Sequence, residues 1–149
     1  MLRDALLAYA HYLSIIAVFV FLVLEVAFVH APLSDPRGAA RLSRIDIGFF
    51  VSAIAALLTG AGRATLGAKG WQFYAHNPFF IAKVSLFFAI AIFSVLPTML
   101  FLRWARGAES GAAPAAGDVQ RARRYVRIEL ALLLLLPLFA VLMARGIGS

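Results

Sequence analysis

Ionisable side chains interrupt the long apolar stretches of this sequence, and they are the residues best placed to do chemistry: His11, Glu25, Lys83 and Glu129. A charge surrounded by hydrocarbon is costly, so such a group pairs, reaches the interface or faces a polar interior. Imidazole can ligate a metal ion, a carboxyl group can pair with a cation or carry a proton, and an ammonium group can hold an anion. We therefore take these interruptions as the best guide to function.

The apolar stretches around them predict four membrane-spanning helices, at residues 5–30, 46–66, 78–103 and 124–145. A bilayer's hydrocarbon core is about 30 Å thick, so a helix needs about 20 mostly apolar residues to cross it. The composition agrees, since 63% of the residues are hydrophobic and the mean hydropathy is +0.91. The first stretch is longer than the apolar part of a secretory signal, so we expect a retained helix. The expected fold is all-α, a transmembrane four-helix bundle in one domain, residues 1–149.

Composition excludes several kinds of site. The chain has no cysteine, which rules out disulfides, iron–sulfur clusters, thiolate metal sites and thiol catalysis. The net charge is +7, but the basic residues lie beside the apolar stretches, so we expect a lipid bilayer and no nucleic acid as partner. The sequence shows no catalytic triad, phosphate loop, zinc motif or paired-carboxylate site, and it therefore assigns no enzymatic reaction.

Turn-forming and capping residues predict where the helices begin and end. Residues 33–44 predict a polar loop, followed by Asp46 at the N-terminus of the second helix, where a carboxylate suits the helix dipole. Asn77 followed by Pro78 predicts an N-cap and the first position of the third helix. Residues 107–117 are rich in Gly, Ala, Ser and Pro and predict a loop before the fourth helix.

Small residues recur at every fourth position of the second helix, at Gly48, Ser52, Ala56 and Gly60. Such a stripe lets another helix approach closely, and it is common in membrane bundles. We expect it to pack the helices of this chain. The alternative is contact with a second copy in a homo-oligomer.

Lysine and arginine are unevenly divided between the two sides of the expected bundle. Nine arginines flank the first and third loops: Arg37, Arg41, Arg44, Arg103, Arg106, Arg121, Arg123, Arg124 and Arg127. Five basic residues belong to the other side: Arg3, Arg63, Lys69, Lys83 and Arg145. Because cytoplasmic loops carry the excess of basic residues, we expect both termini on the non-cytoplasmic side of a cell inner membrane.

Basic side chains and imidazoles lie on that non-cytoplasmic side, with almost no carboxylate among them. They are His11, Arg63, His76, Lys83 and Arg145. One interpretation is that Arg63 and Arg145 reach lipid phosphates, and that the histidines are hydrogen-bonded packing residues. The other is a bound anion. Haem b is a candidate, with His11 and His76 as the candidate iron ligands and with Arg63 and Lys83 near the propionates.

The carboxyl groups lie in the opposite half of the bundle. His11 and Glu25 are 14 residues apart, which places them on one face of the first helix about 21 Å from each other. We expect Glu25 and Glu129 to form ion pairs with arginines at similar depth, namely Arg44, Arg103 or Arg127. A proton path is the alternative for these two residues.

Several short runs over the whole chain carry a family resemblance: residues 8–13 (AYAHYL), Glu25, residues 67–83 (GAKGWQFYAHNPFFIAK), residues 96–98 (LPT) and residues 143–146 (MARG). They resemble the DUF2214 family of small bacterial four-helix membrane proteins. The resemblance implies the fold class and the membrane location. It implies no activity, because the family is uncharacterised.

A second resemblance is to HemJ-type protoporphyrinogen oxidases and CopD-like membrane proteins, because His11, His30 and Lys83 occupy comparable places. It implies haem b, with His11 as a ligand and Lys83 as a site residue. Residues 20–27 differ from the HemJ pattern and include Glu25. The first hypothesis is therefore a haem-b protein in a redox or haem-related role. The alternatives are a CopD-like transport or assembly component, and a quinone- or lipid-binding protein.

Overall fold

The computed structural model describes residues 2–30, 36–67, 70–108 and 110–145. Their regular structure is entirely helical: α1 (Leu2–His30), α2 (Pro36–Leu66), α3 (Gly70–Ala75), α4 (Pro78–Ala108) and α5 (Ala116–Ala144). All of these except the short α3 are long and apolar enough to cross a membrane. The prediction of an all-α, transmembrane four-helix bundle is confirmed.

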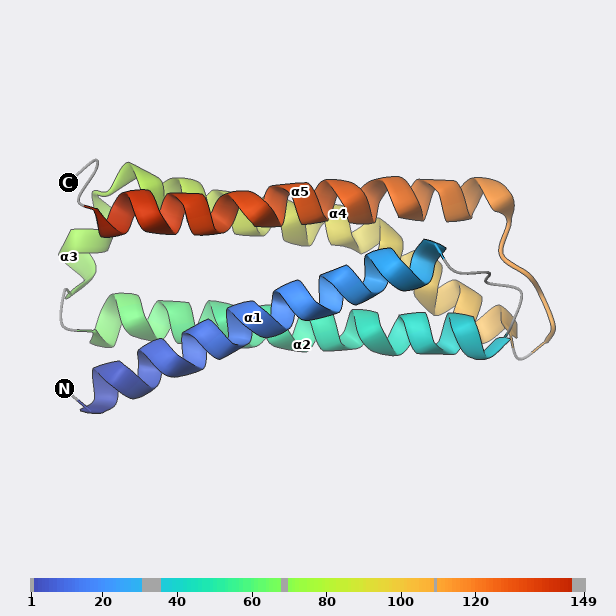
Figure 1. Ribbon diagram of the computed structural model, residues 1–149, viewed down its shortest axis with the longest axis horizontal. Helices are drawn as coiled ribbons and strands as arrows, with labels where there is room; N and C mark the ends of the chain where they lie inside the picture. Colours follow the sequence, from blue (N-terminus) through green and yellow to red (C-terminus); the bar gives the residue numbers. More distant parts are fainter. Residues whose placement is uncertain (1, 31–35, 68–69, 109, 146–149) are drawn as a thin grey trace.

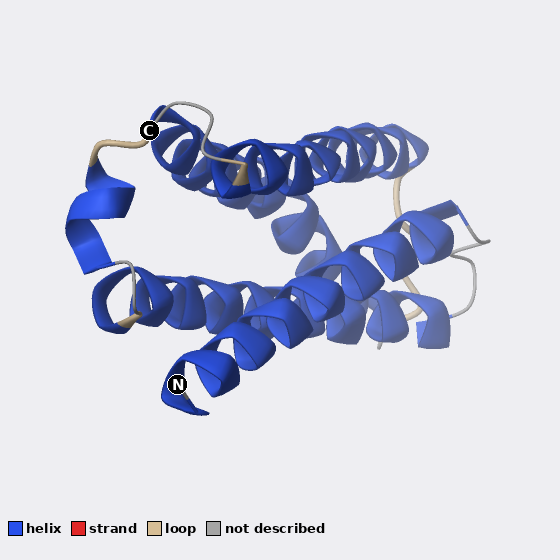
Figure 2. Cartoon of the chain, turned by 60° about the vertical axis from the view of Figure 1, so that its left-hand side comes forward, coloured by secondary structure: helices blue, strands red, loops and turns tan. Residues whose placement is uncertain are grey.

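The bundle consists of two helical hairpins, α1 with α2 and α4 with α5 (Figure 1). They pack together through contacts of α2 with α4 and of α1 with α5. The short α3 connects the hairpins at one end, where the start of α1 and the end of α5 also lie (Figures 1 and 2). We call this the α3 end. The opposite end holds the arginine-rich start of α2, the end of α4 and the start of α5, and we call it the basic end.

The helices at the basic end are longer than predicted. The second helix begins at Pro36 instead of residue 46, α4 ends at Ala108 instead of residue 103, and α5 begins at Ala116 instead of residue 124. The expected loop at residues 33–44 is therefore wrong from Pro36 onward. Hydropathy predicts where a helix leaves the hydrocarbon core of the membrane. The helix itself continues for as long as its residues favour helical conformation and pack against neighbouring helices. Ala39 and Leu42 lie in this extension and are buried.

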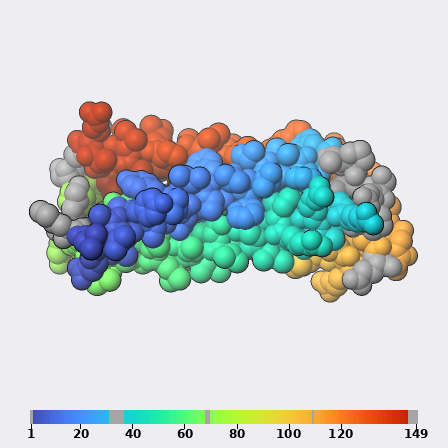
Figure 3. Space-filling view, turned by 60° about the horizontal axis from the view of Figure 1, so that its bottom comes forward, coloured from blue at the N-terminus to red at the C-terminus, as the bar shows by residue number. Residues whose placement is uncertain are grey.

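The core is built from large side chains and close helix contacts. Leu22, Leu42, Phe101 and Leu133 are buried, one from each long helix. Large apolar side chains also cover the outside of the bundle, as expected for helices that face lipid. Figure 3 shows α1 lying along α2.

The small-residue stripe of α2 packs against α1 of the same chain. Gly48 faces Phe21, and Gly60 faces His11. Ser52 and Ala56 between them are buried. The stripe thus lets α1 approach α2 within the chain, and its contact with a second copy stays a prediction.

The start of α4 follows the predicted cap. Asn77 Oδ1 accepts hydrogen bonds from the backbone N–H groups of Phe79, at 3.0 Å, and of Phe80, at 3.3 Å. Pro78 is the first residue of the helix. Asn77 satisfies amides that lack a partner in the first turn, which stabilises the helix where the chain turns back from α3.

Candidate functional site

His11 is held in a defined orientation by α2. Its Nδ1 atom lies 3.1 Å from Thr59 Oγ1. The single hydrogen of the Thr59 hydroxyl is directed to the Ala55 carbonyl at 2.6 Å, so the hydroxyl oxygen accepts from His11 Nδ1–H. This hydrogen-bond network assigns the Nδ1–H tautomer, which leaves the lone pair of Nε2 free.

Gly60 makes room for this imidazole. A Cβ atom at position 60 would lie 3.0 Å from His11 Cε1, which is closer than an ordinary van der Waals contact. Gly60 was predicted only as part of the packing stripe, and Thr59 was not predicted. Thr59 and Gly60 are adjacent on α2, but this adjacency indicates a site for an imidazole only when the face of α2 that meets α1 is known.

Arg63 and Lys83 share the electrostatic environment of His11. Both cations lie near enough to influence the imidazole electrostatically. The Arg63 guanidinium lies 5.4 Å from the centre of the Tyr12 ring, and Lys83 Nζ lies 5.6 Å from the centre of the Phe80 ring. Within the described residues neither cation forms an ion pair with a carboxylate. We call His11, Arg63 and Lys83 the outer layer.

Two other predicted members of this layer lie apart from it. His76 is exposed in the turn between α3 and α4, with Nδ1 3.2 Å from the Gln72 carbonyl. The short α3 packs against α2 and α4 only. Arg145 is the exposed C-cap residue of α5. No contact in the described part of the chain joins His76 or Arg145 to His11, so their roles remain predictions.

Three acidic side chains lie buried between the helices, toward the basic end. Glu25 of α1, Asp46 of α2 and Glu129 of α5 are 1%, 2% and 1% exposed. Asp46 and Glu129 are the ionisable groups near enough to influence Glu25 electrostatically. We call these three residues the carboxyl cluster.

Helix α4 supplies hydroxyl groups to this cluster. Ser94 Oγ lies 2.7 Å from Glu129 Oε2, and Thr98 Oγ1 donates to Asp46 Oδ1 at 2.9 Å. Within the described residues, Oε1 of Glu25 and Oε1 of Glu129 have no hydrogen-bond partner. The cluster is therefore buried but only partly hydrogen-bonded.

The expected ion pairs of Glu25 and Glu129 are wrong. Arg103 pairs with Asp118, Arg127 donates to Nε2 of His30 at 2.6 Å, and Arg44 is exposed. The reason is helical geometry, because residues two positions apart point about 200° away from each other. Arg127 therefore points away from Glu129 on α5.

Asp46 is the cluster member that the sequence analysis misplaced. It was expected to cap a helix, but it lies inside α2, ten residues after Pro36, and faces the core. Ser94 and Thr98 are spaced by four residues and so share one face of α4. This spacing was the available signal for a polar face directed into the bundle.

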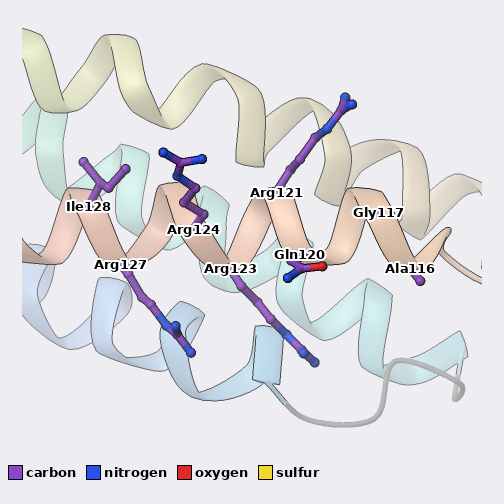
Figure 4. Close-up of a pocket in the computed structure, with 8 residues that line it drawn as sticks. All are labelled: Ala116, Gly117, Gln120, Arg121, Arg123, Arg124, Arg127 and Ile128. Carbon is purple, nitrogen blue, oxygen red and sulfur yellow. The ribbon is translucent and has the colours of Figure 1, made fainter.

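Arginines of α5 close the basic end. Arg123 Nε donates to the Val29 carbonyl at 2.9 Å, and Arg127 contacts His30. Figure 4 shows both side chains directed to the same side of α5, with Arg121 and Arg124 directed to the other. These four arginines line an open hollow of about 1080 Å³. Arg123 donates to a backbone carbonyl in the last turn of α1, and Arg127 donates to the side chain of the last residue of α1. Cations at this end of the helix also complement its dipole.

The described residues contain no group of three or more His, Asp or Glu side chains that could hold a metal ion. A haem iron, by contrast, needs only one or two imidazole ligands from a protein. His11 fits that requirement because one ring nitrogen is hydrogen-bonded and the other is free.

Comparison with known proteins gives the family. No match was found among curated proteins or among solved structures. The chain does match the protein family DUF2214, described as "Predicted membrane protein", over residues 3–148. Because this match spans nearly the whole chain and the structure has four candidate membrane spans, the protein belongs to the DUF2214 family of predicted membrane proteins.

Proposed function

We propose that the outer layer binds a membrane-embedded ligand that carries anionic groups, and that this ligand is haem b. The observation that supports the proposal best is the pairing of His11 with Thr59, which leaves Nε2 free beside two cations. An axial imidazole usually has its second ring nitrogen hydrogen-bonded in this way. The protein would then have a redox or haem-related role in the membrane.

The residues of the outer layer fit the parts of this ligand. His11 would ligate the iron through Nε2, and Arg63 and Lys83 would hold the propionates, since neither has a carboxylate partner in the described part of the chain. Bound haem would supply one-electron redox chemistry. We also propose His76 as a second ligand; its Nδ1 donates to Gln72, which leaves its Nε2 free as well.

The proposal includes a location and an orientation. We propose a cell inner membrane with both termini on the non-cytoplasmic side. The start of α1 and the end of α5 lie at the α3 end, and the arginine-rich helix ends lie together at the opposite end (Figure 1). The positive-inside rule supports the basic end as the cytoplasmic one.

An absorption spectrum of the detergent-purified protein tests the ligand. After expression with ample haem, we expect a Soret band that His11→Ala abolishes. Thr59→Val should weaken haem binding by up to about tenfold, because one neutral hydrogen bond contributes about 0.5–1.5 kcal/mol. His30→Ala is the matched control, because Arg127 already occupies Nε2 of His30.

Colourless protein after such an expression contradicts the haem proposal. The same preparation then separates the alternatives. A quinone or anionic lipid that co-purifies with the protein, and is lost in Lys83→Gln, would assign the outer layer to that ligand. Loss of neither, with an intact fold, favours a transport or assembly role that does not use this layer.

A further inference from the structure

We propose that the carboxyl cluster, together with Ser94 and Thr98, is a proton-binding site inside the membrane span. This site is separate from the outer layer and does not depend on its ligand. Glu25 and His11 lie about 21 Å apart along α1, a distance that no direct hydrogen bond can bridge. Bound protons, and not metal ions, are its proposed ligand, in agreement with the lack of a metal-holding group among the described residues.

The carboxyl cluster has no cation to compensate its charge among the described residues. Three carboxyl groups are at most 2% exposed, and they come from α1, α2 and α5. Taking even one carboxylate out of water costs several kcal/mol unless a cation or hydrogen bonds compensate. The arginines nearest in sequence are exposed or bonded elsewhere, as described above, and α4 contributes only hydroxyl groups to the cluster. Protons are therefore the species that neutralises it.

The Ser94 hydroxyl makes two contacts with oxygen atoms but has a single hydrogen. Its hydroxyl oxygen lies 2.9 Å from the Ile90 carbonyl and 2.7 Å from Glu129 Oε2. Serine has one hydrogen to donate, and a carbonyl oxygen can only accept. Two full hydrogen bonds form when Glu129 carries a proton on Oε2 and donates it to Ser94; with an ionised Glu129 the two acceptors would have to share the single Ser94 hydrogen.

One oxygen of the Glu25 carboxyl group lacks a hydrogen-bond partner among the described residues. Glu25 Oε1 is buried, and no hydrogen bond from the described residues reaches it. Asp46 and Glu129 are the acidic groups that influence it electrostatically, and all three side chains are buried, so the unpartnered oxygen belongs to the same interior group. A bound proton would remove the charge of this carboxylate, for which no donor among the described residues compensates at Oε1.

The three carboxyl groups differ in their surroundings, which suits a site that exchanges protons. Asp46 accepts from Thr98 and so receives a hydrogen bond that favours its ionised form. Glu129 meets a hydroxyl that is directed to Ile90 and that can accept its proton. Titratable groups buried in a span are the usual components of proton relays. The cluster thus has a proton donor and a proton acceptor within one interior group.

Infrared spectroscopy of the full chain in lipid nanodiscs tests the proposal. At neutral pH we expect a C=O band of protonated carboxyl groups that shifts in D₂O. Glu25→Gln and Glu129→Gln should each reduce this band, and both should fold, because glutamine resembles the protonated acid. Asp118→Asn is the matched control, since Asp118 is an acid paired with Arg103 outside the cluster, and it should leave the band unchanged.

A protein without such a band at neutral pH overturns the proposal, and so does a band that neither glutamine variant changes. If the glutamine variants do not fold, Ser94→Ala provides the test. Its loss removes the acceptor of the Glu129 proton, so the band should remain and move to higher frequency. An unmoved band in this variant also overturns the proposal. Haem content affects none of these readouts.

Discussion

Gly48 allows a sharp test of how α1 and α2 pack. A Cβ atom at this position would lie 2.4, 2.6 and 2.7 Å from three carbons of the Phe21 ring. Carbon atoms in favourable contact are about 3.5–4.0 Å apart, so the ring would have to withdraw by about 1 Å. Phe21 packs against the buried core, and its displacement therefore disturbs neighbouring side chains. Overpacking of this kind costs about 1–3 kcal/mol.

Gly48→Ala also has a favourable effect, because alanine is a better helix former than glycine by up to about 1 kcal/mol. Gly62→Ala isolates that effect. A Cβ atom at position 62 has its nearest neighbour, Leu7 Cδ2, at 3.5 Å, which is an ordinary contact. Subtracting the two effects cancels helix propensity. We expect Gly48→Ala to be less stable than Gly62→Ala by about 1–3 kcal/mol.

Denaturation by SDS in mixed micelles, followed by circular dichroism, measures this difference. A double-mutant cycle with Phe21→Ala assigns its cause, because removing the ring should make Gly48→Ala harmless or favourable. Equal stability of the two alanine variants would refute the proposed contact. A cost of Gly48→Ala that persists without the Phe21 ring would refute the assignment to that contact.

Two further predictions concern the helix ends. Asn77→Ala removes the N-cap of α4 and should lower stability by about 0.5–2 kcal/mol in the same assay, whereas Asn77→Asp, which keeps an acceptor oxygen, should lower it less. Equal losses would show that the cap is not the cause. Arg123→Ala leaves the Val29 carbonyl without its donor and should cost about 0.5–2 kcal/mol. Arg121→Ala is its control, because that exposed arginine points away from α1 (Figure 4), and a similar loss there would contradict the capping role.

The membrane spans were predictable because the hydrocarbon thickness imposes a length on every apolar stretch. The helix boundaries at the basic end were not, since a change in polarity was taken as the end of a helix. The start of α2 contained the missing information. Ala39, Leu42, Ile45 and Phe49 are buried and recur at helical spacing through the polar region.

The two polar groups differ in how far the sequence could predict them. The imbalance of charge alone predicted that His11, Arg63 and Lys83 share one level. Their partners depend on which faces of the helices meet, and Thr59 was therefore not found. The same limit explains the carboxyl cluster. Glu25 and Glu129 were recognised as interior residues, but their environment was expected to contain arginines that in fact face the bundle's outside or its end.

The capping of α1 by α5 has a consequence for how the protein is made. The Val29 carbonyl and His30 end the first long helix, but their donors, Arg123 and Arg127, belong to the last one. During translation α1 would therefore enter the membrane with an incomplete end, and it would stay so until the ribosome has nearly finished the chain. A nascent fragment that stops before α5 carries an open carbonyl end and a Glu25 side chain that α5 does not yet enclose, two features that distinguish it from the finished protein.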